Sequence, residues 1–145
     1  MTRTEISRRL RPHRRVLVVA AEAALDRAYA NGDDTQPPSK TQFSRLVNLC
    51  GEATCAEELE NYLRYQAGRS AKGGRDDWRM GFVDIIVKAI NEALEKEIDL
   101  GELGREDQDL ARVEAWRLYA TYLARAYTYR DAVAKSSRYG GRHAR

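Results

Sequence analysis

The residue types that most often carry catalysis or hold metals are few in this chain of 145 residues, and they lie far apart. The histidines are His13 and His143, near opposite ends, and the two cysteines, Cys50 and Cys55, do not form a Cys-x-x-Cys pair. Zinc sites need about four such ligands at short paired spacings, and an activated nucleophile needs a base beside it. The sequence therefore predicts a protein that is not an enzyme and has no metal site and no cofactor.

The acidic residues do not suggest acid–base catalysis either. They occur in runs such as 57–60 and 92–97, at spacings typical of solvent-facing helix positions, where ion pairs form one turn apart. No segment shows the alternation of a strand, so no glycine-rich loop follows a strand as in nucleotide-binding sites. Two cysteines are too few for a disulfide scaffold and fit the reduced thiols of a cytosolic protein.

The elements that position these residues are helices. Apolar residues recur three and four positions apart in five segments, proline is rare, and alanine, leucine, glutamate and arginine dominate the long segments. Thr54 and Glu57 have the spacing of a capping box before the third segment. We expect an all-α fold, a compact bundle of about five helices with flexible basic termini. The expected helices cover about 12–30, 40–50, 56–67, 82–94 and 107–135, within a bundle domain of residues 12–135 flanked by a basic N-terminal extension (1–11) and a flexible basic tail (136–145).

The charge is distributed unevenly along the chain. Net charge is only +3, but arginines crowd residues 3–15 and 117–145, whereas the middle of the chain is acidic. Of the 25 basic residues 20 are arginines, whose planar guanidinium binds phosphate oxygens in pairs and stacks on aromatic rings. This pattern suits contact with nucleic-acid phosphates, and equally the stacking of basic ends on the acidic sides of other copies. Arginine-rich solvated tails without a function are the third interpretation.

The last helix carries two aromatic faces. Trp116, Tyr119, Leu123 and Tyr127 form one stripe, which we expect in the core. A second stripe on the opposite side is unusual for a helix that has only one buried face. Either the helix is packed on both sides, or the Tyr–Arg–Tyr part of this stripe binds a protein partner or stacks on unpaired bases. This stripe contains Leu118, Tyr122, Arg125 and Tyr129.

No segment predicts export or a membrane span. The apolar run of residues 16–21 ends at Glu22, which makes it shorter than a signal-peptide core. No stretch approaches the roughly 20 apolar residues that cross a bilayer. We expect a cytoplasmic protein without membrane contact.

Two short segments carry a resemblance to a known family. A helix starts at Ser39-Lys40-Thr41-Gln42-Phe43, and the third helix ends in Tyr65-Gln66-Ala67-Gly68-Arg69, the pattern Tyr-x-x-Gly-Arg. With the aliphatic and tyrosine-rich helices that follow, residues 39–133 resemble the small helical subunit of type III CRISPR effector complexes. The arginine-rich N-terminus and the Pro37-Pro38 loop are not part of the family pattern.

The resemblance implies a non-catalytic RNA-binding subunit of a ribonucleoprotein complex for antiviral defence. In that family, several copies stack beside larger subunits and line the channel that holds guide and target RNA, contacting the RNA backbone without reading its sequence. By matched position, Lys40, Arg45 and Arg69 are the implied RNA contacts. Arg125 joins them as a nucleic-acid-binding candidate from the second stripe of the last helix, in which Tyr122 and Tyr129 are the candidate partner-binding residues.

Two other functions remain open at this point. The chain could be a helical protein–protein adaptor or regulator with incidental basic tails. The second and third helices, joined at Gly51, could also form the helix-turn-helix of a transcription regulator. Against the latter, Glu57, Glu58 and Glu60 would repel a DNA backbone.

Overall fold

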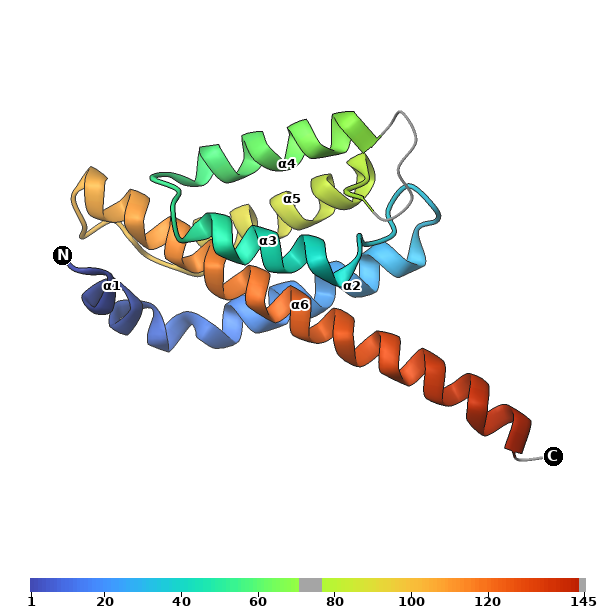
Figure 1. Ribbon diagram of the computed structural model, residues 1–145. Coiled ribbons are helices and arrows are strands. Elements are labelled where there is room, and N and C mark those ends of the chain that lie inside the picture. The colour runs from blue at the N-terminus through green and yellow to red at the C-terminus, as the bar shows by residue number, and fades with distance from the viewer. Residues whose placement is uncertain (71–76, 144–145) are drawn as a thin grey trace.

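The computed structural model describes residues 1–70 and 77–143, with side chains up to residue 137. The described residues form a bundle of helices without strands (Figure 1), which confirms the all-α bundle that the sequence predicts. Its helices are α1 (Arg3–Leu10), the 3₁₀ turn η1 (Arg11–His13), α2 (Arg14–Ala30), α3 (Lys40–Cys50), α4 (Ala56–Ser70), α5 (Met80–Lys96) and α6 (Arg105–His143).

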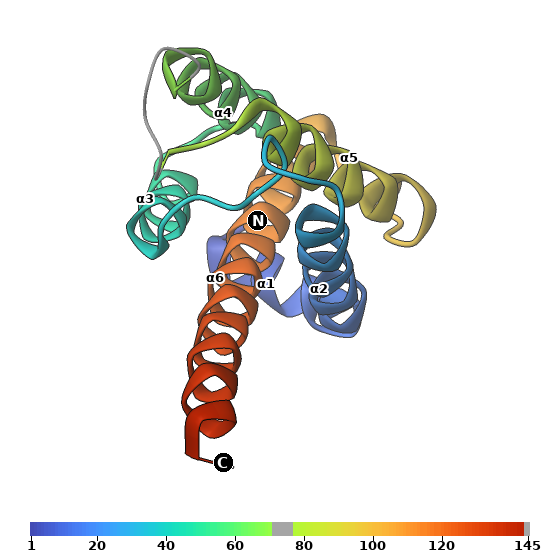
Figure 2. The same ribbon diagram turned by 90° about the vertical axis from the view of Figure 1, so that its right-hand side faces the viewer.

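Helix α6 is the central element of the bundle. It passes between α3 on one side and α2 on the other (Figure 2), and its N-terminal half also packs against α1. Every residue from Val113 to Ala120 is buried except Arg117, which is half-buried. The burial of Leu118 therefore shows that the second stripe of this helix begins in the core, because α6 is packed on both sides at this level.

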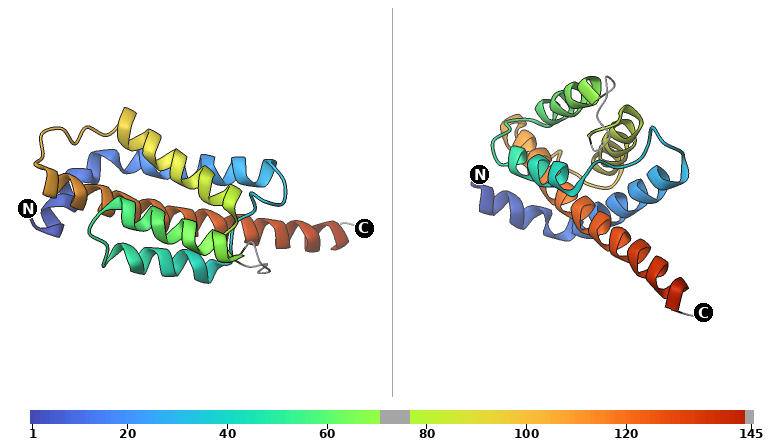
Figure 3. Two further views of the ribbon diagram at one scale, coloured as in Figure 1. Left: turned by 90° about the horizontal axis from the view of Figure 1, so that it is seen from above. Right: turned by 45° about the vertical axis from the view of Figure 1, so that its right-hand side comes forward.

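The C-terminal half of α6 leaves the bundle. Figures 1 and 3 show this part of the helix projecting well beyond the other five helices. Residues 131–137 are all exposed, and Tyr129 is 71% exposed. The helix continues to His143, past the end at residue 135 that we expected, so residues 136–143 of the expected tail are helical. The last two residues of that tail lie outside the described chain.

The arginine-rich N-terminus is part of the packed structure. Residues 3–10, expected as part of an extension outside the bundle, form α1, and Ile6 and Leu10 are 0% and 1% exposed in the core. Thr2 and Glu5 form a reciprocal capping box that starts the helix. Arg3 donates a hydrogen bond of 2.6 Å to the Gly51 carbonyl at the end of α3. The boundary at residue 11 therefore does not mark the edge of the core.

The start of α4 is capped by a different residue from the one expected. The Glu58 carboxylate, not that of Glu57, accepts hydrogen bonds from the Thr54 N–H at 2.8 Å and from its hydroxyl at 2.7 Å. These two hydrogen bonds lower the pKa of Glu58. The capping interaction exists, but its acceptor is one residue further along the chain.

Aromatic side chains join α3, α5 and α6 at one end of the core. The Phe43 ring lies 5.7 Å from Trp78, 6.0 Å from Phe82 and 5.5 Å from Tyr127, measured between centroids. Deeper in the bundle, the buried Tyr119 hydroxyl donates a hydrogen bond of 2.9 Å to the Ile86 carbonyl. Burial raises the pKa of this phenol, so it remains a neutral donor that fixes α5 against α6.

Cys50 gives the fold a predictable response to alkaline pH. The thiol is fully buried at the end of α3, and burial raises its pKa from 9.0 to about 12. Between these values the unfolded chain loses the proton and the folded chain keeps it, so this group favours unfolding as pH rises. Below pH 9 the stabilisation is fully present. We expect its contribution to fall by up to about 1.4 kcal/mol per pH unit between pH 9 and 12.

The measurement is urea unfolding of the parent and of Cys50→Ala across this pH range. Other groups titrate here in both proteins, so the difference between the two isolates Cys50. We expect the stability advantage of the parent to shrink above pH 9. An advantage that stays constant up to pH 11 would contradict the burial of a protonated thiol.

Across residues 1–70 and 77–143, no helix is both long enough and apolar enough to cross a membrane.

Candidate functional site

The first candidate surface is basic and lies on the α3–α4 hairpin. Lys40, Arg45 and Arg69 are all exposed, and none of them forms an ion pair with another described residue. Helix α3 contains no aspartate or glutamate, and its exposed side chains are all cationic or neutral hydrogen-bonding groups. We call Lys40, Arg45 and Arg69 the basic α3–α4 surface.

The hairpin brings two of these residues to the same end of the bundle. Helices α3 and α4 are joined by a short loop and run in opposite directions, spreading apart away from that loop (Figure 1). Lys40 is the first residue of α3, and Arg69 is the last residue but one of α4, so both lie at this end. Arg45 lies further along α3, turned by roughly 140° from Lys40 because five residues separate them. The surface is a band around the hairpin rather than a tight cluster.

The end of α4 adds an aromatic ring to this surface. Tyr65 is 60% exposed, and the Arg69 guanidinium lies 5.7 Å from the centre of its ring. Both residues belong to the Tyr-x-x-Gly-Arg segment. The stacking holds the arginine beside the helix surface and leaves its N–H donors facing solvent.

The hairpin does not have the form of a helix-turn-helix. In that motif two helices cross at a steep angle, so that the second enters the major groove. Here the two helices run in opposite directions at a shallow angle (Figure 1), and α4 begins with exposed Glu57 and Glu58. The geometry and the charge both oppose insertion of α4 into DNA.

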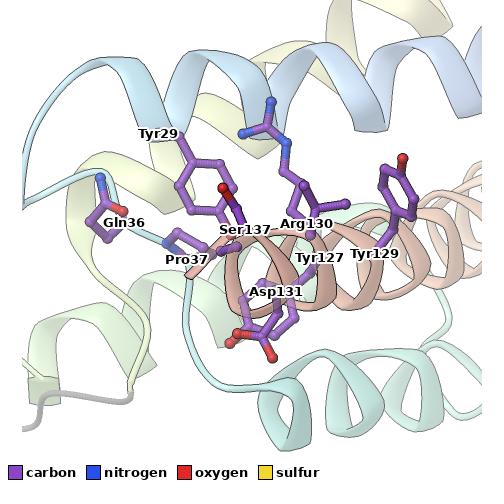
Figure 4. A pocket seen from close by; sticks show the side chains of 10 residues that line it. Tyr29, Gln36, Pro37, Tyr127, Tyr129, Arg130, Asp131 and Ser137 are labelled. Atoms are coloured by element: carbon purple, nitrogen blue, oxygen red, sulfur yellow. The ribbon is translucent and has the colours of Figure 1, made fainter. Parts of the chain in front are cut away.

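The second candidate surface is a groove between α2 and the C-terminal half of α6. Its outer part has a volume of about 820 Å³ and a mostly aromatic and aliphatic lining (Figure 4). Its inner part has a volume of about 530 Å³, and the two parts share Tyr129 and Arg130. We call the two parts together the α2–α6 groove. Residues that line it include Tyr29, Pro37, Tyr127 and Val133 in the outer part, and Glu22, Asp26, Tyr122, Arg125 and Ala126 in the inner part.

Arg130 of α6 contacts α2 across the groove. Its guanidinium forms an ion pair with Asp26 of α2 and lies 4.6 Å from the centre of the Tyr29 ring. Burial raises the pKa of Tyr29, so its hydroxyl stays neutral at physiological pH. The arginine is therefore already paired and stacked within the chain, and it has little capacity left for a phosphate.

A loop closes the outer end of the groove. The Thr35 hydroxyl donates to the Ala28 carbonyl at 2.6 Å, and the Gln36 amide donates to the Gly32 carbonyl at 2.7 Å. This loop crosses the start of α5 at Gly81, where an added Cβ would lie 2.7 Å from the Asp34 carboxylate. The close approach of the loop to α5 holds Gln36 and Pro37 at the mouth of the groove (Figure 4).

The structure separates the predicted site residues into these two surfaces. Lys40, Arg45 and Arg69 lie on the hairpin, whereas Arg125 lines the inner part of the α2–α6 groove together with residues of α2. Tyr122 and Tyr129 line the same groove, and the Arg125 guanidinium lies 6.0 Å from the Tyr122 ring centre. The second stripe thus runs from buried Leu118 through half-buried Tyr122 to exposed Tyr129.

Sequence reasoning missed the α2 wall of this groove. Glu22 and Asp26 are one turn apart on α2 and Tyr29 follows three residues later, a spacing that marks a second, polar face of this helix. The spacing does not identify the helix that forms the other wall of the groove. The groove exists only where α2 packs against α6, about a hundred residues away in the chain.

In the described part of the chain, no three histidine, cysteine or acidic side chains are grouped so that they could hold a metal ion. Comparisons with protein-family models, with curated proteins and with solved structures give no match to this chain.

Proposed function

We propose that this protein is a non-catalytic RNA-binding subunit of a type III CRISPR ribonucleoprotein complex. Several copies would stand beside larger subunits, each contacting the backbone of the guide or target RNA. The observation that supports this proposal best is the basic α3–α4 surface, in which exposed Lys40, Arg45 and Arg69 have no carboxylate partner among the described residues. The same segment carries the two motifs that resemble the family.

Physical chemistry favours the RNA backbone as the ligand of this surface. Unpaired surface cations attract phosphates over several ångströms and release counterions on contact, without a need for a shaped pocket. Among the described residues, Lys40, Arg45 and Arg69 are exposed and line neither part of the α2–α6 groove, so they can meet phosphates without enclosing a base. The proposed binding is therefore independent of RNA sequence.

The α2–α6 groove is a weaker place for RNA. Asp26 neutralises Arg130, and Glu22 lines the same inner part of the groove as Arg125, so a phosphate in this groove would meet carboxylates as well as arginines. We therefore leave Arg125 out of the proposed RNA surface. The exposed Tyr129 and Val133 of the groove favour a protein contact instead, which also supports the adaptor function as the second candidate.

The test compares two triple variants of equal charge. Lys40→Ala, Arg45→Ala, Arg69→Ala removes one lysine and two arginines from the basic surface. The control, Lys88→Ala, Arg105→Ala, Arg112→Ala, removes the same groups from exposed positions elsewhere in the bundle. Binding to a labelled single-stranded uridine oligonucleotide is measured by fluorescence anisotropy at low salt.

We expect the first variant to bind on the order of tenfold more weakly or worse, because it loses three charge-assisted contacts, while the control stays within about twofold of the parent. Equal weakening of both variants would show that only net charge matters. Unchanged binding by the first variant would remove the main support for the proposal.

A further inference from the structure

The last turns of helix α4 place an exposed aromatic ring beside an exposed cation on the outside of the bundle (Figures 1 and 2). Tyr65 is 60% exposed, and the Arg69 guanidinium lies over its ring. Among the described residues, neither the Tyr65 hydroxyl nor the Arg69 guanidinium has a hydrogen bond or an ion pair. Because the guanidinium covers one face of the ring, the other face is open to a second flat group.

A glycine leaves the helix surface bare beside this ring. Gly68 and Arg69, three and four positions after Tyr65, are its neighbours on the next turn. The φ angle of Gly68 is not positive, so the backbone does not require a glycine. A Cβ added there would meet no other described side chain within 4 Å apart from those of its chain neighbours. The glycine is thus unfavourable for the helix and not needed for packing, but it leaves room for a flat group against the ring.

The charge at this end of α4 suits an anionic group. From Tyr65 to Ser70 the helix carries one charged side chain, that of Arg69, and no carboxylate. The nearest preceding carboxylate in the helix, that of Glu60, is partly buried and pairs with Arg64 at 3.4 Å. An anion that approaches Arg69 therefore meets no competing acid in this turn. A flat aromatic group joined to an anion is the chemistry of a nucleotide.

We infer that Tyr65, Gly68 and Arg69 form a subsite for one unpaired nucleotide. The base stacks on the open face of the Tyr65 ring, beside the bare backbone at Gly68, and Arg69 binds a phosphate of the same strand. Every base has an aromatic face, so this stacking does not read sequence. It does require a base outside a duplex, because paired bases are already stacked on both faces.

The subsite rests on the proposed function, because Arg69 belongs to the basic α3–α4 surface. It narrows the ligand of that surface to an RNA segment that contains an unpaired base. The phosphate contacts of Lys40 and Arg45 need no such base, so the two proposals can fail separately.

The experiment compares a short labelled adenosine oligonucleotide with an abasic oligonucleotide of the same length and charge, by fluorescence anisotropy at low salt. We expect the parent to bind the adenosine strand about fivefold or more tightly than the abasic strand, the contribution of one stacked base. Tyr65→Ala should bind both strands equally, at the affinity of the parent for the abasic strand. Tyr65→Phe keeps the ring and should keep the preference.

The matched control removes another exposed tyrosine. Tyr129 is 71% exposed and lies in the α2–α6 groove, so Tyr129→Ala should keep the preference for bases. Salt separates stacking from charge: Tyr65→Ala should leave the slope of log affinity against log salt unchanged, whereas Arg69→Ala should make it shallower by roughly 0.7.

Substitutions of the glycine test the space beside the ring. Gly68→Leu fills this space with a side chain that favours the helix, and it should abolish the preference for bases without lowering the melting temperature. Gly68→Ala adds only a Cβ and should keep most of the preference. Circular dichroism of every variant verifies that its helices are intact.

The outcomes distinguish the subsite from the proposed function. A preference that survives in Tyr65→Ala, or that is lost equally in Tyr129→Ala, would overturn the subsite. If the parent binds both strands equally and the Lys40–Arg45–Arg69 triple variant binds neither, the backbone contact stands and only the subsite is wrong. If the parent binds neither strand, the proposed function fails as well, and the exposed tyrosine and arginine then indicate a protein contact.

Discussion

Deletion of residues 1–11 is expected to unfold the protein or to leave it only marginally stable. This segment looks like a dispensable arginine-rich tail, but it contributes fully buried Ile6 and Leu10 to the core. Loss of a buried isoleucine or leucine side chain costs about 2–5 kcal/mol each. Two such losses approach the total stability of a small domain, roughly 5–15 kcal/mol. Thermal unfolding followed by circular dichroism measures the effect.

The matched control keeps the helix and removes charge. Arg8→Ala, Arg11→Ala changes two exposed arginines without touching the core, and it should shift the melting temperature by only a few degrees. If the deletion melts at the same temperature as this control, α1 is not part of the cooperative core. If the deletion unfolds the protein as expected, truncation of residues 1–11 cannot be used to test what the basic charge of this segment contributes to binding.

Replacement of Trp78 by alanine is expected to have the second large effect. The indole is fully buried between Phe43 and Phe82, at centroid distances of 5.7 and 6.1 Å, and it anchors the chain at the start of α5. Its loss leaves a large cavity, for which we expect a cost of about 3–5 kcal/mol. Urea unfolding monitored by the fluorescence of Trp116 measures this cost.

The conservative variant distinguishes packing from polarity. Among the described residues, the Trp78 indole N–H has no hydrogen-bond acceptor, so Trp78→Phe removes an unsatisfied donor while keeping an aromatic ring. We expect it to lose far less stability than alanine, about 1–2 kcal/mol. Equal losses in both variants would show that the aromatic cluster does not hold α3 and α5 together.

The sequence predicted the helices well, because apolar periodicity reports directly which residues face a core. The stripe with Phe82, Ile86 and Ile90 is buried as expected, and α2 and α3 begin and end within two residues of their expected limits. Helix α4 begins where it was expected and ends three residues later. Periodicity also indicated that α6 has two apolar faces. It did not show where α6 leaves the bundle, since this depends on the lengths of the neighbouring helices.

The sequence analysis did not predict helix α1, because its charged residues obscured the spacing of its two apolar residues. Four of its eight residues are arginine or glutamate on the solvent side, and only Ile6 and Leu10, one turn apart, face the core. The spacing of Thr2 and Glu5 is a capping box, and this was the signal that could have identified the helix. Charge describes where a helix meets water and does not exclude a buried side.

The two candidate surfaces differ in how much of each could be predicted from the sequence. Lys40, Arg45 and Arg69 came from matched motifs, and a single hairpin of neighbouring helices places them, so little beyond local structure was needed. The α2–α6 groove requires a contact between segments about a hundred residues apart, such as the ion pair of Asp26 with Arg130. Local patterns identified its tyrosines but not its acidic wall.

The two surfaces suit two different kinds of ligand. The basic α3–α4 surface would contact RNA, while the α2–α6 groove, with its balanced charges and exposed Tyr129 and Val133, would contact protein. They lie on opposite sides of α6 (Figure 2), so one copy could use both at once. This arrangement fits a subunit of a larger assembly better than an isolated protein.

The salt dependence of RNA binding tests the central claim most directly. The affinity for a single-stranded oligonucleotide is measured from about 50 to 200 mM salt for the parent, the Lys40–Arg45–Arg69 triple variant and its control. Each phosphate contact adds roughly 0.7 to the slope of log affinity against log salt. The account predicts a slope shallower by about 2 in the triple variant and unchanged in the control. A parent without measurable binding at 50 mM salt, or equal slopes in all three proteins, would contradict it.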